Sequence, residues 1–329
     1  MNNEIKLEVK NLTKYYPVVK GAFKKVVGHV KAVDDVSFSV RQGETFGIVG
    51  ESGCGKTSLG KCLVRLQETS SGELVFHDQD AGEMNLLKLT KAQSFRMRKK
   101  IQIVFQDPYS SLNPLKTVYT SFDEPLKIHH MGDKKKRMEI IAEMFRLINL
   151  NPDFMHRYPH EFSGGQRQRI CIARALCVQP DIVVCDEPVS ALDVSVQAQI
   201  LNLLKDLQKS RRLTYIFISH DLSVVEYMSD QIAVMYLGQI VELANAKHLY
   251  ETCKHPYTKA LISAIPAIDY DKKPLRNLVE GELPNPANPP AGCNFHTRCP
   301  LADERCRSEE PKLRKIGDLE HHFVACHLA

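Results

Sequence analysis

The sequence contains no tryptophan and no long run of apolar residues. Its apolar stretches, such as "IVVC" and "IAVMYL", have the length of β-strands, whereas a membrane-spanning helix needs about 20 apolar residues. We therefore expect that the chain does not cross a membrane by itself. A strong charge of either sign is also missing, because the net charge is only +5 over 329 residues. This mild excess permits a phosphate-bearing ligand or an acidic partner without requiring one.

Disulfide bonds are not expected, although ten cysteines are present. No apolar leader segment opens the sequence, and the length is sufficient for an apolar core. These features favour a reducing, cytoplasmic environment. Six of the cysteines lie in apolar or glycine-rich surroundings: Cys54, Cys62, Cys171, Cys177, Cys185 and Cys253.

The chain contains three regions with different secondary-structure patterns. From Lys6 to Val49 short strand patterns predominate, interrupted by a basic segment over Lys20–Lys31 that we interpret as an extended hairpin loop. The segment 107–161 lacks strand signals and has apolar residues at helical spacing, which predicts a helical insertion. Strand and helix patterns then alternate over residues 181–242. This alternation predicts an α/β core with a mostly parallel sheet covered by helices.

Residues 50–57, "GESGCGKT", fit the phosphate-loop pattern G-x-x-x-x-G-K-S/T, and they follow a predicted strand and open a predicted helix. Glycines let backbone N–H groups approach a polyphosphate, and the positive end of the helix adds to the attraction. Lys56 would contact the β- and γ-phosphates, and Thr57 would bind Mg²⁺. We expect the nucleotide to contact Gly50, Glu51, Ser52, Gly53, Cys54, Gly55, Lys56, Thr57 and Ser58.

Two acidic residues and a histidine follow later predicted strands. Asp186 and Glu187 come directly after the apolar run "IVVC", so Asp186 could bind the metal and Glu187 could polarise the attacking water. An exposed acid without a role is the simpler alternative for Glu187. His220, in "FISHD", could hydrogen-bond the γ-phosphate and the same water, although a single histidine is more often structural.

A second anion site is predicted in "FSGGQRQRICIARAL", where Ser163, Gly164, Gly165 and Gln166 precede a strongly helical run. A hydroxyl, unshielded N–H groups and the helix dipole all attract anions. Because the phosphates already face the helix that Lys56 opens, this site would serve the nucleotide of a second subunit. A serine N-cap followed by a tight turn is the competing interpretation.

Taken together and in this order, the motifs resemble the ATP-binding cassette family of transport ATPases, over roughly residues 5–261. The resemblance implies an α/β, P-loop NTPase fold with a RecA-like core, an antiparallel β subdomain and a helical subdomain at about residues 107–162. It also implies ATP hydrolysis with Mg²⁺. The residues that it makes catalytic are Lys56, Gln106, Glu187 and His220, and those that it assigns to Mg²⁺ are Thr57, Gln106 and Asp186.

Further roles follow from the same resemblance. Gln106 of "VFQDP" would read the γ-phosphate and communicate with the helical insertion, and Asp193 of "SALD" would cross the subunit boundary. Tyr16 fits the position that stacks on adenine, with Tyr15 beside it as the alternative.

The segments "QDPYSSLNPLKTV" and "NPPAGCNFHTRCPLADERC" resemble the oligopeptide, dipeptide and nickel importer subgroup. This likeness implies a nucleotide-binding domain over residues 1–264 and a cysteine-rich extension over residues 265–329. It implies a peripheral position on the cytoplasmic face of the inner membrane, with a related second ATPase subunit, two permeases and an extracytoplasmic solute-binding protein as partners, and no nucleic acid. The solute could be a dipeptide, an oligopeptide or nickel.

Four cysteines near the end, Cys293, Cys299, Cys306 and Cys326, form a C-x5-C-x6-C-x19-C series. Zinc sites favour ligand pairs two to four residues apart, which this series lacks. Wider spacing suits a 4Fe–4S cluster, and similar extensions in peptide importers are associated with one. Zinc and metal-free thiols are the alternatives. A mixed site could also use His296, His321, His322 or His327, although surface histidines are commoner.

Two other functional classes are alternatives for this chain. A soluble cassette ATPase acting on ribosomes or DNA usually carries two cassettes or a long coiled coil, whereas this chain has one unsplit cassette. An iron–sulfur sensor with a secondary ATPase activity would depend on the tail cysteines. An importer ATPase therefore remains the favoured hypothesis.

Overall fold

The computed structural model describes residues 4–21, 25–79, 81–265, 281–317 and 321–329. These residues form two compact units. The first unit contains Glu4, Arg41–Glu44 and Lys88–Ile216, and the second contains Ile5–Val40, Thr45–Leu87 and Phe217–Ala329. Within the described ranges, every helix is too short or too polar to span a lipid bilayer.

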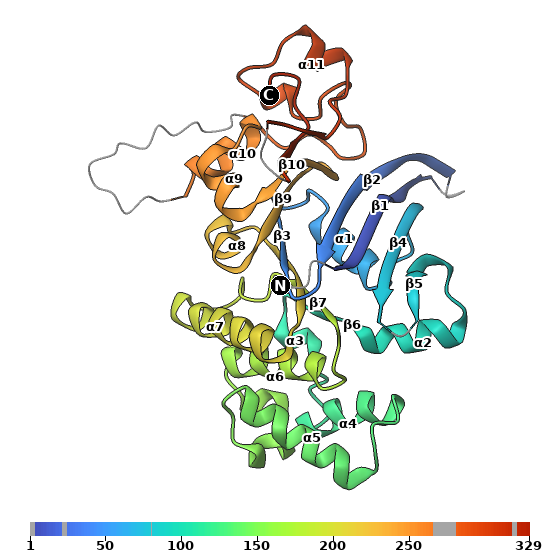
Figure 1. Cartoon of the computed structure of the whole chain (residues 1–329), viewed down its shortest axis with the longest axis vertical. Helices are drawn as coiled ribbons and strands as arrows, with labels where there is room; N and C mark the ends of the chain where they lie inside the picture. The colour runs from blue at the N-terminus through green and yellow to red at the C-terminus, as the bar shows by residue number, and fades with distance from the viewer. Residues whose placement is uncertain (1–3, 22–24, 80, 266–280, 318–320) are drawn as a thin grey trace, which may run out of the picture. The chain divides into compact units, whose positions relative to one another are not determined.

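The first unit is built on two short parallel strands (Figure 1). Strand β6 (Ile101–Val104) pairs with β7 (Ile182–Asp186), with Val104 opposite Cys185. Every residue of β7 is buried, as expected for a strand covered on both faces. Helices α2 (Lys91–Lys100) and α6 (Gly164–Leu176) pack on β6.

Helices α3 (Pro108–Ser111), α4 (Val118–Ile128) and α5 (Lys134–Leu147) follow β6 and pack against α6. The segment 107–161, all of which is described, contains helices and no strand, as its apolar spacing predicts. Short 3-10 turns, η2 (Pro152–His156) and η3 (Pro159–Glu161), complete it.

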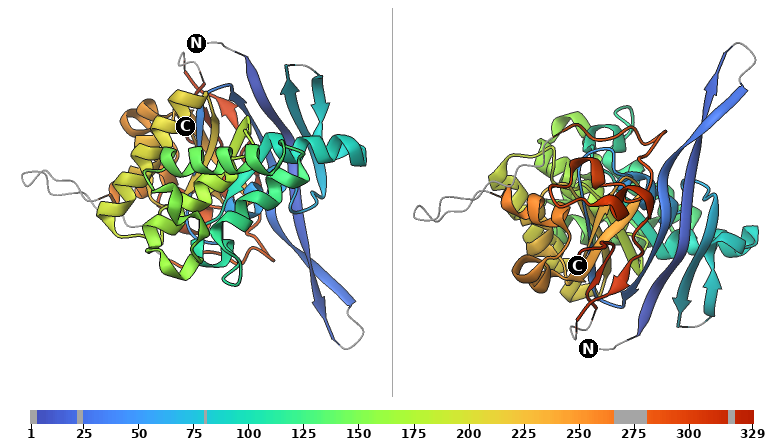
Figure 2. Two further views of the ribbon diagram at one scale, coloured as in Figure 1. Left: turned by 90° about the horizontal axis from the view of Figure 1, so that it is seen from below. Right: turned by 90° about the horizontal axis from the view of Figure 1, so that it is seen from above.

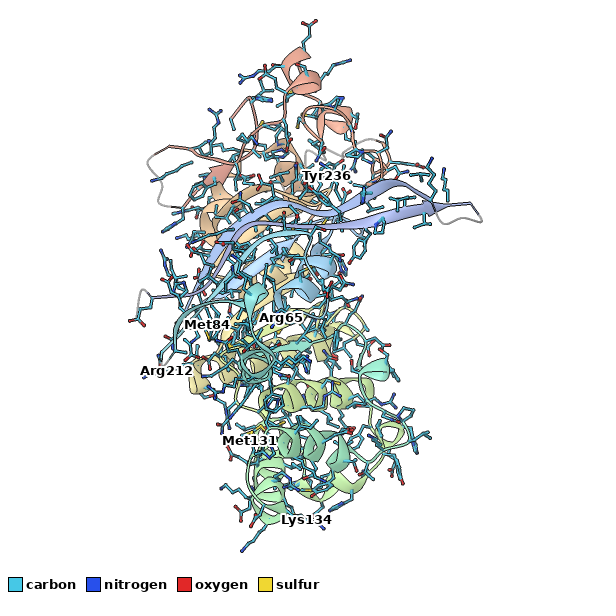
Figure 3. All side chains as sticks on the ribbon, turned by 90° about the vertical axis from the view of Figure 1, so that its right-hand side faces the viewer. Arg65, Met84, Met131, Lys134, Arg212 and Tyr236 are labelled. Atoms are coloured by element: carbon cyan, nitrogen blue, oxygen red, sulfur yellow. The ribbon has the colours of Figure 1, made fainter. Side chains whose placement is uncertain are left out.

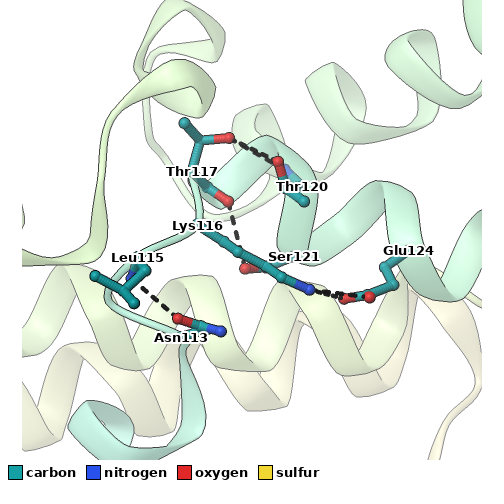
Figure 4. A network of polar contacts seen from close by, with 7 residues as sticks. All are labelled: Asn113, Leu115, Lys116, Thr117, Thr120, Ser121 and Glu124. Atoms are coloured by element: carbon teal, nitrogen blue, oxygen red, sulfur yellow. Dashed lines mark hydrogen bonds and ion pairs between the residues drawn. The ribbon is translucent and has the colours of Figure 1, made fainter.

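Polar contacts fix the start of α4 (Figure 4). Thr117 caps the helix by accepting the backbone N–H of Thr120 at 3.4 Å, and its carbonyl accepts the Ser121 hydroxyl, also at 3.4 Å. Lys116 pairs with Glu124 at 3.0 Å, in the second turn of the helix. The loop before Lys116 is thereby anchored while its Leu115 side chain stays 85% exposed.

Helix α7 (Val194–Arg211) packs against α6 and ends at Arg212, which adopts the left-handed conformation (φ 53°). Arg212 and Lys134, the first residue of α5, are labelled in Figure 3. Along the chain, β8 (Thr214–Ser219) runs from the first unit into the second.

One sheet of the second unit has the strand order β2-β1-β4-β5. Strand β4 (Ser71–Asp78) is antiparallel to both β1 (Ile5–Lys20) and β5 (Gly82–Asn85). Figure 2 shows β1 and β2 (Lys25–Arg41) as a long ribbon. The prediction of a loop over Lys20–Lys31 was wrong for residues 25–31, because the valines in "KVVGHVK" favour extended pairing even where they are exposed.

The other sheet of the second unit is only partly parallel. Strand β3 (Thr45–Val49) is parallel to β9 (Gln231–Tyr236), but β10 (Gln239–Asn245) returns antiparallel to β9 through Leu237 and Gly238, both with positive φ. The expected mostly parallel arrangement was wrong for this end of the sheet, since a two-residue turn produces a hairpin. Helix α8 (Leu222–Met228) packs on β3, and α9 (Ala246–Thr252) packs on β9 and β10.

The C-terminal segment continues this sheet. Strand β12 (Phe323–Val324) pairs with β10, and β11 (Arg314–Lys315) pairs with β12. The segment also contributes η4 (His296–Arg298) and α11 (Glu304–Ser308). His322 is buried and its Nε2 lies 2.8 Å from Oε1 of the equally buried Glu242 on β10. This tail is therefore held by strand pairing and a buried polar contact.

Candidate functional site

The predicted phosphate loop has the expected strand–loop–helix geometry. Strand β3 ends at Val49 and helix α1 (Lys56–Leu63) begins at Lys56, with Gly55 as its N-cap at φ 108°. A Cβ atom at Gly55 would lie 1.9 Å from the carbonyl oxygen of Ala32, so both the backbone angle and the close approach require glycine.

Lys56 points into the loop rather than into solvent. Its side chain is buried, and Nζ donates to the carbonyl oxygens of Gly50 at 2.7 Å and Glu51 at 3.0 Å. Ser52, Gly53 and Thr57 are exposed on the same segment. The Lys56 ammonium group is thus enclosed by the backbone of the loop, and the Thr57 hydroxyl lies on the exposed side. This arrangement is suited to a phosphate chain with an oxygen-liganded Mg²⁺.

The two candidate tyrosines have different environments. The Tyr15 hydroxyl donates to Asp34 on β2, whereas the Tyr16 hydroxyl donates to Gln67, just beyond α1. Neighbouring residues on a strand point to opposite faces. Tyr16 therefore faces α1, the helix that follows the phosphate loop, whereas Tyr15 faces the other side of the strand. This orientation favours Tyr16 over Tyr15 as the adenine-stacking residue. Burial, with the adjacent Asp34, raises the pKa of Tyr15.

Three predicted residues meet at the ends of β6 and β7. Asp186 is buried as the last residue of β7, and Gln106 Nε2 donates to Glu187 Oε2 at 3.0 Å. Glu187 has φ 48°, which is uncommon for a residue other than glycine and costs about 1–3 kcal/mol. Its carbonyl accepts the Ser190 hydroxyl at 3.1 Å, which helps to hold this conformation.

His220 follows β8 and is exposed. The next residue, Asp221, caps α8 by accepting the backbone N–H groups of Ser223 at 2.8 Å and Val224 at 3.3 Å. The end of β8 is thereby anchored, and the imidazole is presented on the surface of its own unit.

Ser163 caps α6 in a reciprocal arrangement. Its Oγ accepts the backbone N–H of Gln166 at 3.3 Å, and the Gln166 side chain accepts the Ser163 N–H at 3.0 Å. The N-cap interpretation is therefore correct as local structure. It leaves the Ser163 O–H able to donate to an anion, so the two interpretations do not exclude each other.

The start of α7 lies against this helix end. A Cβ atom at Gly165 would be 2.6 Å from Cγ1 of Val196. Asp193, the N-cap of α7, makes no capping hydrogen bond with its side chain and is exposed, and Val194 is 82% exposed.

The candidate residues thus divide between the two units. The first unit contains Gln106, Asp186, Glu187, Asp193 and the group Ser163, Gly164, Gly165 and Gln166. The second contains Tyr16, the loop residues 50–58 and His220.

The predicted cluster site in the tail is not supported. Among the described residues, no group of three or more His, Cys, Asp or Glu side chains is placed to hold a metal ion. The pKa of the Cys293 thiol is raised to about 11, mainly by burial, with smaller contributions of the same sign from Cys306, Cys326 and Cys299 and an opposing one from a backbone hydrogen bond at Phe295. The thiols therefore lie near enough to influence one another, and all ten cysteines of the chain are free.

The tail histidines are engaged elsewhere. His296 Nδ1 lies 2.9 Å from the carbonyl oxygen of Cys293, and His327 Nε2 lies 2.9 Å from that of Glu309. His322 was expected at the surface, but it is buried beside Glu242 because β12 pairs with β10.

Two residues that contact the phosphate loop were not found from the sequence. Tyr257, in α10 (Pro256–Ser263), accepts the Glu51 backbone N–H at 2.9 Å, and Arg298 forms an ion pair with the Glu51 carboxylate. No local pattern marks either residue, because each lies more than 200 positions from the loop.

Two family models match the chain. The model described as "ABC transporter" matches residues 33–190, and the model described as "Oligopeptide/dipeptide transporter, C-terminal region" matches residues 241–306.

Curated relatives match over almost the whole length. The chain is 50% identical to the oligopeptide transport ATP-binding protein AppF of Bacillus subtilis, covering 99% of this chain and 98% of the relative. It is 48% identical to the di/tripeptide transport ATP-binding protein DppF of Pseudomonas aeruginosa, covering 99% and 98%, and 49% identical to the dipeptide transport ATP-binding protein DppF of Haemophilus influenzae, covering 99% of each.

Solved structures show the same fold. An ATP-binding cassette described as dimeric, in a post-hydrolysis state bound to ADP and Pi, matches with a TM-score of 0.62 and 27% identity. It covers 73% of this chain and 98% of that structure. A second dimeric structure, titled as a bacterial ABC transporter cassette, has the same TM-score and coverage with 28% identity.

Proposed function

This chain belongs to the family of ATP-binding proteins of oligopeptide and dipeptide ABC transporters, and we propose that it is the ATP-hydrolysing subunit of a membrane importer for di- or oligopeptides. The observation that carries this proposal is the phosphate loop at residues 50–57, with Lys56 buried inside it. The names of the full-length relatives support the peptide class of solute.

ATP is the substrate, and Mg²⁺ supplies charge neutralisation on its phosphates. Oxygen donors of the kind Mg²⁺ prefers come from Thr57, Gln106 and Asp186. Lys56, released from its contacts with Gly50 and Glu51, neutralises the β- and γ-phosphates. Glu187 accepts a proton or hydrogen bond from the attacking water, and Gln106, bonded to the same carboxylate, links that step to helix α3, which begins two residues later.

A second subunit, a copy or a relative, completes each nucleotide site. Ser163 keeps an O–H to donate, and the N-terminus of α6 adds N–H groups and a positive dipole end. The neighbouring residues Asp193 and Val194 are exposed, and they are proposed to lie at the same subunit interface. His220, exposed after β8, is proposed to contact the γ-phosphate and to stabilise its charge.

Permease subunits are the proposed partners of the helical segment 107–161. Exposed apolar side chains there include Leu115, Tyr109 and Ile128, of which Leu115 is held outward by the anchored loop before α4. We place the subunit peripherally on the cytoplasmic face of the inner membrane, with an extracytoplasmic solute-binding protein delivering the solute to the permeases. Nickel is the alternative solute for this subgroup.

The 4Fe–4S cluster is kept as a separate hypothesis for Cys293, Cys299, Cys306 and Cys326. Its support is their spacing along the chain, and the positions of the described side chains do not support a bound metal. Iron, sulfide and zinc analysis of anaerobically purified protein, compared with the Cys299→Ser variant, tests it. Iron and sulfide lost together in the variant support the cluster; zinc alone or no metal contradicts it.

The function is tested with the assembled complex. The subunit is co-expressed with candidate permease and partner ATPase subunits, and the complex is purified from membranes. Its ATPase activity is then assayed with and without peptide and binding protein. Peptide-stimulated hydrolysis is expected. Stimulation by Ni²⁺ instead would reassign the solute, and a chain that copurifies with ribosomes rather than permeases would overturn the importer proposal.

A further inference from the structure

The C-terminal extension reaches the phosphate loop through a two-pronged ion pair. Arg298 Nη1 lies 2.9 Å from Glu51 Oε2, and Arg298 Nη2 lies 3.1 Å from Glu51 Oε1. The Arg298 side chain is only 8% exposed and that of Glu51 is 29% exposed. Bidentate guanidinium–carboxylate pairs that are shielded from water are stronger and more rigid than surface pairs.

Glu51 is part of the phosphate-binding backbone. Its N–H donates to the Tyr257 hydroxyl at 2.9 Å and its carbonyl accepts Lys56 Nζ at 3.0 Å. A carboxylate at this position has the same sign of charge as the phosphates that the loop is built to bind. Without a nearby cation, it would repel them and compete for Lys56.

The position of Arg298 is also fixed by residues other than Glu51. Arg298 ends η4, whose neighbour Phe295 is buried among the rings of Tyr236, Tyr257 and His255. Arg298 Nη1 also lies 3.5 Å from the Tyr236 hydroxyl; Tyr236 is labelled in Figure 3. Its buried Nε has no hydrogen-bond partner among the described residues. The guanidinium is therefore stabilised mainly by Glu51.

We propose that Arg298 is a positioning residue for nucleotide binding: it neutralises Glu51 and holds the first turn of the phosphate loop open to the β- and γ-phosphates. This inference rests on the proposed ATPase function. It gives the C-terminal extension a direct influence on nucleotide affinity, because Arg298 belongs to that extension and lies between Cys293 and Cys299 in the chain.

The test compares a single and a double charge removal in the full-length protein. Arg298→Gln leaves the Glu51 carboxylate uncompensated, so the Kd for MgATP should rise about tenfold, and that for AMP should change little because it lacks β- and γ-phosphates. Added salt should reduce the defect. The double variant Glu51→Gln/Arg298→Gln removes both charges and should bind MgATP within about threefold of the wild type.

Arg305→Gln provides a matched control, because Arg305 pairs with Glu309 in the same extension on an exposed helix. It should leave nucleotide affinity unchanged. Arg298→Lys keeps the charge with a poorer geometry and should give an intermediate Kd, which provides a measurement even if the Gln variant folds poorly.

Two results overturn the inference. One is an unchanged MgATP affinity in Arg298→Gln with only a lower unfolding temperature, which would make Arg298 a packing residue. The other is a double variant that binds no better than the single variant. If the wild-type protein itself fails to bind MgATP, the proposed function fails instead, so the two failures are distinguishable.

Discussion

Gln106 and Glu187 are hydrogen-bonded across the ends of two parallel strands, with Gln106 Nε2 3.0 Å from Glu187 Oε2. The strand register explains this contact, because Val104 on β6 is opposite Cys185 on β7 and each residue of the pair lies two positions further on. A carboxylate proposed to polarise water is therefore bonded to the side chain that precedes the helical segment. Hydrolysis and movement of that segment can be linked through one hydrogen bond.

Glu187→Gln should lower the ATPase rate at least about 100-fold while MgATP still binds, because the amide cannot accept the proton from water. The ATP-bound closed dimer should then accumulate, which size-exclusion chromatography with ATP would detect. Glu68→Gln, at an exposed position, is the matched control and should retain wild-type activity. A wild-type rate in Glu187→Gln would remove Glu187 from the proposed mechanism.

Ser163→Asp should separate the capping role of Ser163 from its role in the partner's nucleotide site. Aspartate is as good an N-cap as serine and suits the helix dipole, so the unfolding temperature should not fall. Its charge would repel a γ-phosphate, so ATP-dependent dimerisation in the Glu187→Gln background should be lost. Ser163→Asn keeps the cap without the charge and should dimerise more readily. Normal dimerisation of Ser163→Asp would show that this helix end does not meet nucleotide.

Gly165→Ala should destabilise the first unit by about 1–2 kcal/mol, because the added Cβ would overlap Val196 Cγ1 at 2.6 Å. In a Val196→Ala background the same substitution should be neutral or stabilising, since alanine favours helix by about 1 kcal/mol over glycine. Urea unfolding of the four proteins measures both effects.

Gly164→Ala is the control, because its Cβ would have no neighbour closer than 3.7 Å. An equal loss of stability from Gly165→Ala in both backgrounds would show that Val196 is not the cause.

Stability should fall as the pH is lowered through the range in which unfolded histidine titrates. Burial lowers the pKa of His255 to about 3, and its Nδ1 accepts the Tyr257 N–H at 3.1 Å, so the folded protein holds it neutral. The unfolded state takes up a proton below about pH 6.5, where the folded state does not. This difference removes about 2 kcal/mol between about pH 7 and pH 5.

His255→Asn keeps a capping acceptor and should abolish that component, as measured by urea unfolding at both pH values. His29→Asn, on an exposed part of β2, should leave it in place. Glu242 also lies at this site, because its Oε2 accepts the His255 backbone N–H at 3.0 Å. An unchanged pH dependence in His255→Asn would contradict the assignment.

Local sequence signals predicted most of the residues that we propose for the nucleotide site. The phosphate loop was found because glycine at positive φ, a preceding strand and a following helix are short-range requirements, and Gly55 satisfies all of them. The same holds for the Ser163 cap. The sequence patterns gave wrong predictions where strand pairing decided the structure. The examples are the antiparallel β9–β10 hairpin and the first residues of β2, which are extended rather than part of a loop.

The sequence by itself determined which residues can bind phosphate, cap a helix or accept a proton, because those properties depend on residue type and on a few neighbours along the chain. Only the tertiary structure decided that Arg298 neutralises Glu51, that His322 is buried against Glu242 and that Gln106 bonds Glu187. These contacts join residues 80 or more positions apart, and they depend on strand register and packing, which leave no periodic signal in the sequence.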